Sequence, residues 1–67
     1  MKISKFTKPE LDFFRENCNF VNHEVTLFEM RAAGHTIEEI AEKLNLSVEH
    51  AYRISRQVND KIIRVLW

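Results

Sequence analysis

The chain has almost no cysteine, glycine or proline, since its 67 residues include only one of each. A single cysteine, Cys18, cannot form an internal disulfide, and no Cys/His cluster has the spacing of metal ligands. One glycine and one proline leave few turn signals, and no alternating run of β-branched residues lies between such signals. These absences argue against disulfide-stabilised, metal-stabilised and strand-based folds. They favour an all-α protein without a bound metal.

Long hydrophobic runs are also absent. Residues 1–8 carry three lysines as a basic arm, and no apolar segment follows that could act as a signal sequence or a membrane span. Together with the single cysteine, this pattern predicts a cytoplasmic protein with no membrane partner. At 45% hydrophobic residues, the chain can form one small domain, residues 1–67, near the lower size limit for a single core.

Groups that catalyse reactions are missing too. The three histidines, His23, His35 and His50, have no mutual spacing for a metal site or a catalytic pair. Ser47 has no Gly-rich elbow and no partnered base, so a helix cap explains it fully. We therefore expect neither an enzyme nor a bound cofactor.

An excess of either charge is absent, because ten Lys and Arg balance ten Asp and Glu. This balance counts against DNA binding, since the neutralisation of phosphates supplies much of the affinity. The charges are unevenly distributed, however. Residues 37–44 are rich in Glu, whereas residues 53–64 carry four basic side chains and one Asp. A monomer is expected to bind DNA weakly, which favours a dimer or a larger assembly.

Hydrophobic periodicity and capping signals predict four helices with short connections. They span about residues 8–17, 22–33, 37–44 and 48–65. Thr7 with Glu10, and Thr36 with Glu39, form capping boxes that start the first and third helices. Asn22 is the expected cap of the second helix.

Apolar stripes predict which helix faces are buried. The stripe of the first helix is Leu11, Phe14 and Cys18. Phe13 lies on another face and needs a second partner. The second helix has two apolar faces, as expected for a central helix packed on both sides: Val21, Val25, Phe28 and Ala32 on one, Leu27 and Met30 on the other. The last helix has one long stripe, formed by Ala51, Ile54, Val58, Ile62 and Val65.

Residues 36–55 read TIEEIAEKLNLSVEHAYRIS and have apolar side chains where a helix-turn-helix needs them. Two short helices that cross steeply must bury a small set of side chains between them. That set is Ile40, Ala41, Leu44, Leu46, Ala51 and Ile54. Ala41 lies where the helices approach most closely, and Asn45 tolerates the left-handed backbone of the turn. Ser47 can cap the second helix of the motif.

This motif resembles the helix-turn-helix of bacterial sigma factor region 4 and of LuxR-type DNA-binding domains. The matching residues are Thr36, Glu38, Glu39, Ile40, Ala41, Leu44, Leu46, Ser47, Glu49, Ala51 and Ile54. The resemblance covers about residues 20–62 and implies a bacterial or phage transcription regulator or a sigma-like protein. In that family the promoter element is read by the positions that match Val48, Glu49, Tyr52 and Arg53. Only Glu49 keeps the expected residue type, so the family's target sequence is not carried over.

The resemblance predicts that the outward face of the last helix, the recognition helix, reads double-stranded DNA in the major groove. The base-reading candidates are Glu49, Tyr52, Arg53 and Arg56. Arg53 or Arg56 can bind guanine O6 and N7 in bidentate fashion, and Glu49 can accept a hydrogen bond from a cytosine amino group. The candidates for phosphate contacts are Thr36, Lys43, Ser47 and Lys61.

Alternatives remain open for these residues. Arg53 and Arg56 can simply solvate an exposed face. The same fold can also serve as a protein-interaction module that binds RNA polymerase or another regulator through its acidic third helix. Ile63 and Trp67 lie one turn apart, away from the core stripe, which predicts a surface for a homodimer or another partner protein. The alternative for Trp67 is packing against the first helix.

Overall fold

Each helix begins and ends close to the residues that the sequence indicates. The computed structural model describes residues 2–66 and contains no strand within them. Its elements are a short 3-10 helix, η1 (Ile3–Lys5), and the α-helices α1 (Lys8–Asn17), α2 (His23–Ala32), α3 (Ile37–Leu44) and α4 (Val48–Leu66). The prediction of an all-α chain with four α-helices is therefore confirmed.

Both predicted capping boxes are present. The Thr7 hydroxyl accepts a hydrogen bond from Glu10 N–H at 3.4 Å, and Glu10 Oε1 accepts one from Thr7 N–H at 2.7 Å. Thr36 and Glu39 make the same exchange at 3.1 and 2.8 Å. Each box satisfies backbone N–H groups that have no partner within the helix, which explains where α1 and α3 begin.

The start of α2 differs from its prediction. Asn22 precedes the helix, but its φ of 53° lies outside the extended region of a capping residue, and its side chain makes no capping hydrogen bond. Glu24 Oε1 instead accepts a hydrogen bond from Val21 N–H at 3.1 Å. The predicted asparagine cap is therefore absent, and the N–H groups of Glu24 and Val25 donate instead to the backbone oxygens of Val21 and Asn22.

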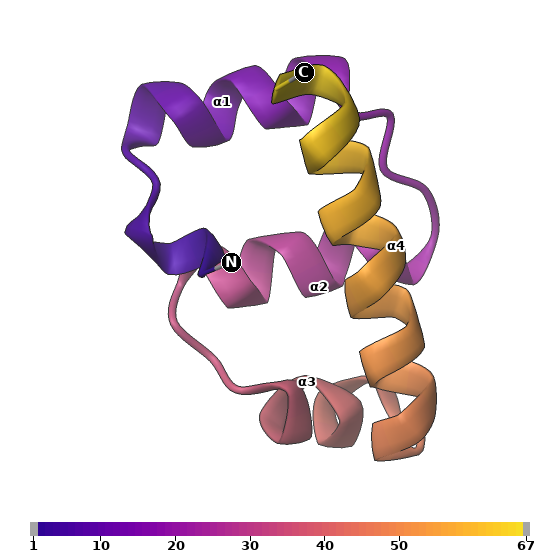
Figure 1. Cartoon of the computed structure of the whole chain (residues 1–67). Coiled ribbons are helices and arrows are strands. Elements are labelled where there is room, and N and C mark those ends of the chain that lie inside the picture. The colour runs from indigo at the N-terminus through magenta and orange to yellow at the C-terminus, as the bar shows by residue number, and fades with distance from the viewer. Residues whose placement is uncertain (1, 67) are drawn as a thin grey trace.

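The longest element, α4, contacts all three other α-helices. Figure 1 shows α3 beside its amino-terminal turns, α2 beside its middle and α1 near its carboxy-terminal end. The described chain measures 30 × 18 × 18 Å. At a rise of about 1.5 Å per residue, the 19 residues of α4 run nearly the whole length of the molecule. One helix therefore joins the helix-turn-helix to the opposite end, where α1 lies.

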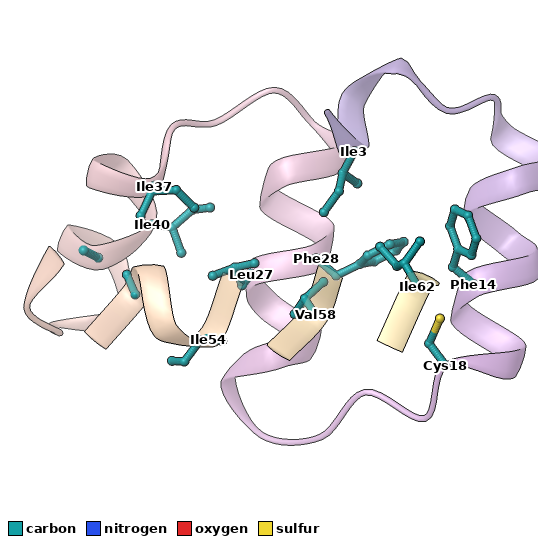
Figure 2. Close-up of a cluster of buried hydrophobic side chains, with 12 residues drawn as sticks. Ile3, Phe14, Cys18, Leu27, Phe28, Ile37, Ile40, Ile54, Val58 and Ile62 are labelled. Atoms are coloured by element: carbon teal, nitrogen blue, oxygen red, sulfur yellow. The ribbon is translucent and has the colours of Figure 1, made fainter. Parts of the chain in front are cut away.

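A single hydrophobic core runs along α4 (Figure 2). Its buried apolar residues are Ile3, Phe14, Cys18, Leu27, Phe28, Ile37, Ile40, Ala41, Ala51, Ile54, Val58 and Ile62. The predicted α4 stripe is confirmed, because four of its five members are buried and Val65 packs against them partly buried. Ile3 was not expected in the core. Its burial anchors the lysine-rich amino terminus against the rest of the protein, so this segment is not a free basic arm.

One predicted face of α2 is buried only at Phe28 and, in part, at Ala32, so the prediction is wrong for Val21 and Val25. Val21 and Val25 are 45% and 46% exposed. Phe28, on the same predicted face, is buried beneath Phe20 of the preceding loop, with ring centroids 4.7 Å apart. Phe20, in the loop before α2, therefore covers Phe28, whereas the predicted stripe had the two valines buried there.

Candidate nucleic-acid interface

The helix-turn-helix is held together by small and branched apolar side chains between α3 and α4. Ile40 and Ala51 are fully buried, Ala41 is 2% exposed and Ile54 is 6% exposed. The two alanines let the helices approach closely, because each contributes only a methyl group to the contact. Burial of the predicted set is confirmed here, while Leu44 and Leu46 pack partly buried at its edge.

The turn between the helices has the predicted conformation. Asn45 is left-handed, with φ 57° and ψ 44°, and Leu46 N–H donates to Ala41 O at 2.8 Å. Ser47 Oγ then accepts from His50 N–H at 3.1 Å, which confirms the predicted cap of α4. These hydrogen bonds fix the direction in which α4 leaves the turn. They therefore determine which face of α4 is exposed to solvent.

Three of the four base-reading candidates lie on that outer face. Glu49, Arg53 and Arg56 are exposed, and none of them forms a salt bridge within residues 2–66. At 100° per residue they lie within about 60° of one another around α4, opposite the buried stripe. Two guanidinium groups and one carboxylate are therefore available to a ligand from a single direction.

Tyr52 is held differently from the other candidates. Its hydroxyl donates to Glu38 Oε2 of α3 at 3.3 Å, although the residue is 48% exposed. This hydrogen bond links the two helices of the motif across their exposed edge. Tyr52 therefore remains half-exposed, while its hydroxyl is already engaged.

The phosphate candidates fall into two groups. Lys43 is exposed and forms no salt bridge in the described part of the chain. Thr36 and Ser47 accept hydrogen bonds from backbone N–H groups, so only their hydroxyl protons remain for an outside acceptor. A phosphate at either residue would be bound by a hydroxyl whose position the helix start already determines.

Lys61 has a structural role. Its Nζ donates to Glu24 Oε1 at 2.5 Å and to Asn19 O at 3.0 Å, and its side chain is only 25% exposed. Burial by itself would raise the pKa of Glu24. The hydrogen bonds from Lys61 and from Val21 N–H outweigh burial and hold that pKa below its ordinary value. We therefore remove Lys61 from the phosphate contacts, because its charge is used to join α4 to α2.

The motif is not basic as a whole. Residues 36–57 contain three basic side chains, Lys43, Arg53 and Arg56, against four Glu. Of the four, Glu38 accepts from Tyr52, and Glu39 accepts from Thr36 N–H, which lowers its pKa. The positive charge is concentrated on α4, so its outer face and the acidic surface of α3 are electrostatically distinct.

The far end of α4 carries exposed apolar groups. Ile63 is 43% exposed, in agreement with its prediction, and Leu66 and Phe13 are 50% and 46% exposed. An apolar groove of about 220 Å³ lies beside them, lined by Pro9, Glu10, Phe13, Phe14 and Leu66. Trp67, which was predicted to share this surface, lies outside the described residues.

Sequence patterns missed the Lys61–Glu24 pair and the exposure of Leu66. Glu24 interrupts the apolar stripe of α2, which is a local signal that this glutamate needs a buried partner. Nothing local identifies Lys61, 37 residues away, as that partner.

No protein-family model, curated protein or solved structure matches this chain. Among residues 2–66, no helix is long and apolar enough to cross a membrane. Within the same residues, no three His, Cys, Asp or Glu side chains are grouped so that they could hold a metal ion.

Proposed function

We propose that this protein is a sequence-specific DNA-binding regulator of transcription, or a sigma-like protein, that inserts α4 into the major groove. The observation that carries the proposal is the pairing of a tightly packed helix-turn-helix with two exposed arginines, Arg53 and Arg56, on the outer face of α4. An exposed arginine without an ion partner can form bidentate hydrogen bonds with guanine O6 and N7 at no cost in broken salt bridges.

The residues divide into two roles. Arg53, Arg56 and Glu49 read base edges, and the ring of Tyr52 packs against the groove wall or a thymine methyl group. Lys43, together with the hydroxyls of Thr36 and Ser47, binds the backbone and determines register. Each bidentate arginine contributes about 1–3 kcal/mol of discrimination against the wrong base pair.

The charge distribution predicts a modest salt dependence. Three cations, Lys43, Arg53 and Arg56, are available on the motif. Of these, only Lys43 is assigned to a phosphate. With about 0.9 counterions released per phosphate contact, that one contact lowers the affinity roughly 3.5-fold between about 50 and 200 mM salt. Proteins that make many phosphate contacts lose far more affinity over the same range.

Fluorescence anisotropy with labelled duplex DNA at low and moderate salt tests the proposal. The Arg53→Ala, Arg56→Ala variant should bind more weakly, by about 1–3 kcal/mol per arginine, and discriminate less between duplex sequences, whereas Lys43→Ala should reduce the salt slope by about 1. Lys5→Ala, Lys8→Ala removes the same charge as the double arginine variant from an exposed segment outside the motif and should leave binding close to that of the parent chain. Absence of binding by the parent chain at tens of micromolar, or an equal loss in the two double variants, would contradict the proposal.

A protein-interaction module is the second candidate. Glu42 of α3 is exposed and forms no salt bridge in residues 2–66, and the motif has more acidic than basic groups. On this alternative, Glu42→Lys would abolish binding to purified RNA polymerase or to another regulator. On the DNA-binding proposal, the same substitution adds a cation near Lys43 and strengthens DNA binding.

A further inference from the structure

An apolar patch lies where α1 and α4 meet, and no other described part of the chain covers it. We define the α1–α4 patch as Phe13, Ile63 and Leu66, which are between 43% and 50% exposed. The apolar groove lined by Pro9, Phe13 and Leu66 continues the patch onto α1. Three large exposed apolar side chains next to a groove mark a surface that binds a partner.

The patch is directed away from Arg53, which is one of the proposed base-reading residues. Around α4, Ile63 lies about 80° and Leu66 about 140° from Arg53, both in the same direction, at 100° per residue. The patch therefore faces roughly at a right angle to Arg53. A partner docked on it leaves the guanidinium group of Arg53 accessible.

The borders of the patch carry opposite charges. On α1, Glu10 and Glu16 each lie about 60° from Phe13 around the helix, one on either side. On α4, Arg56 lies about 20° from Ile63 around the helix and about two turns nearer its amino terminus. All three side chains are exposed. A surface with an acidic edge on one helix and a basic edge on the other is complementary to itself under two-fold rotation, since each acidic edge meets the basic edge of the other copy.

We propose that the occupant of the α1–α4 patch is a second copy of this chain, in an isologous dimer whose two-fold axis runs parallel to the Arg53 direction. That axis makes the two α4 helices antiparallel and leaves both Arg53 side chains on the same side of the dimer. Ten residues separate Arg53 from Ile63 and thirteen separate it from Leu66. At about 1.5 Å per residue, the two Arg53 positions are roughly 30–39 Å apart along the helices.

This spacing matches DNA. Successive major grooves on one side of the duplex repeat every 34–36 Å or so, which is the half-site separation of two-fold symmetric helix-turn-helix dimers. The match rests on the proposed function, whereas the dimer itself follows from the patch and its charges. The dimer also presents two copies of Lys43 and Arg53 to DNA, while Arg56 of each copy pairs with the acidic edge of the other copy.

Sedimentation equilibrium at about 100 µM, a concentration suited to a small interface, tests the dimer without DNA. The parent chain should be dimeric, and Ile63→Glu should weaken the dimer at least about tenfold, because it places a charge in an apolar contact. Val25→Glu is the matched control, since Val25 is 46% exposed but lies on α2, outside the patch. A monomeric parent chain, a dimer that survives Ile63→Glu, or a dimer lost only in Val25→Glu would each overturn the proposal.

Pulsed electron paramagnetic resonance then measures the arrangement. Arg53→Cys, in a chain with Cys18→Ala, carries one nitroxide per copy at the proposed reading position. A label separation of about 30–40 Å is expected from the helix rise. A separation well outside that range in a confirmed dimer would overturn the antiparallel arrangement. Neither measurement uses DNA, so failure of the dimer is distinguishable from failure of DNA binding.

Discussion

The ion pair between Lys61 and Glu24 is expected to contribute more to stability than any exposed pair in this protein. Lys61 Nζ lies 2.5 Å from Glu24 Oε1 and 3.0 Å from Asn19 O, and the side chains are 25% and 10% exposed. Lys61→Ala leaves a carboxylate without its counterion between α2 and α4. Breaking a fully buried pair costs about 3–5 kcal/mol, and the partial exposure of Lys61 reduces this to about 2–3 kcal/mol.

Thermal unfolding at pH 7 followed by circular dichroism measures this cost. For a domain of this size, 1 kcal/mol corresponds to about 4–8 °C, so Lys61→Ala should lower Tm by roughly 10–20 °C. Lys8→Ala is the matched control, because it removes an exposed pair to Asp12 at 3.9 Å and should cost under about 0.5 kcal/mol. Lys61→Met combined with Glu24→Gln removes both charges but keeps an acceptor for Val21 N–H. It should cost less than Lys61→Ala alone.

The pH dependence gives a second test with a defined sign. The pKa of Glu24 is held below its ordinary value of 4.5 in the folded protein. The stabilisation it contributes is therefore present above about pH 4.5 and is lost as the pH falls through the lowered pKa. In Lys61→Ala, burial acts on Glu24 without the lysine and raises its pKa, so acidification relieves the destabilisation. The stability difference between parent and variant should shrink from pH 7 towards pH 4. A difference that does not change with pH, or a cost equal to that of Lys8→Ala, would refute this reasoning.

Substitutions at Thr36, Ala41 and Asn45 test the helix-turn-helix, with Thr7 as a control outside it. Ala41→Leu should cost about 1–3 kcal/mol in urea unfolding, because the larger side chain forces α3 and α4 apart at a residue that is 2% exposed. Asn45→Val should cost about 1–2 kcal/mol because Asn45 has a φ of 57°, whereas Asn45→Gly should be nearly neutral; equal effects would contradict the role of the left-handed turn. Thr36→Ala and Thr7→Ala should each lower stability by about 1 kcal/mol through loss of a capping box. Only Thr36→Ala should also weaken DNA binding, and a loss in both variants would remove Thr36 from the phosphate contacts.

Local interactions explain the part of the fold that could be predicted. The capping boxes at Thr7 and Thr36 and the left-handed Asn45 depend on hydrogen bonds and backbone angles within a few residues. Sequence patterns therefore placed the helix boundaries within about a residue or two, as boundary definitions themselves vary by that much. The stripe along α4 was equally readable, because a long helix with one apolar face has only one way to bury it.

Long-range contacts explain the rest. The burial of Ile3 and the cover that Phe20 gives Phe28 depend on how the segments fold back on α2, and neither changes a local periodicity. The proposed DNA-binding interface also combines features set by local spacing with features set by long-range contacts. Its exposed arginines were predictable from the α4 wheel, whereas the bond from Tyr52 to Glu38 joins residues 14 positions apart.

The sequence by itself thus determined the four helices, the helix-turn-helix turn and the outward face of α4, since each depends on spacing within one or two turns. Only the tertiary structure decided which charged and apolar side chains remain available to a partner. It assigned Lys61 to Glu24 rather than to solvent, and it brought Phe13 of α1 beside Leu66 of α4. The physical reason is that the availability of a side chain depends on what packs against it, and those neighbours come from distant parts of the chain.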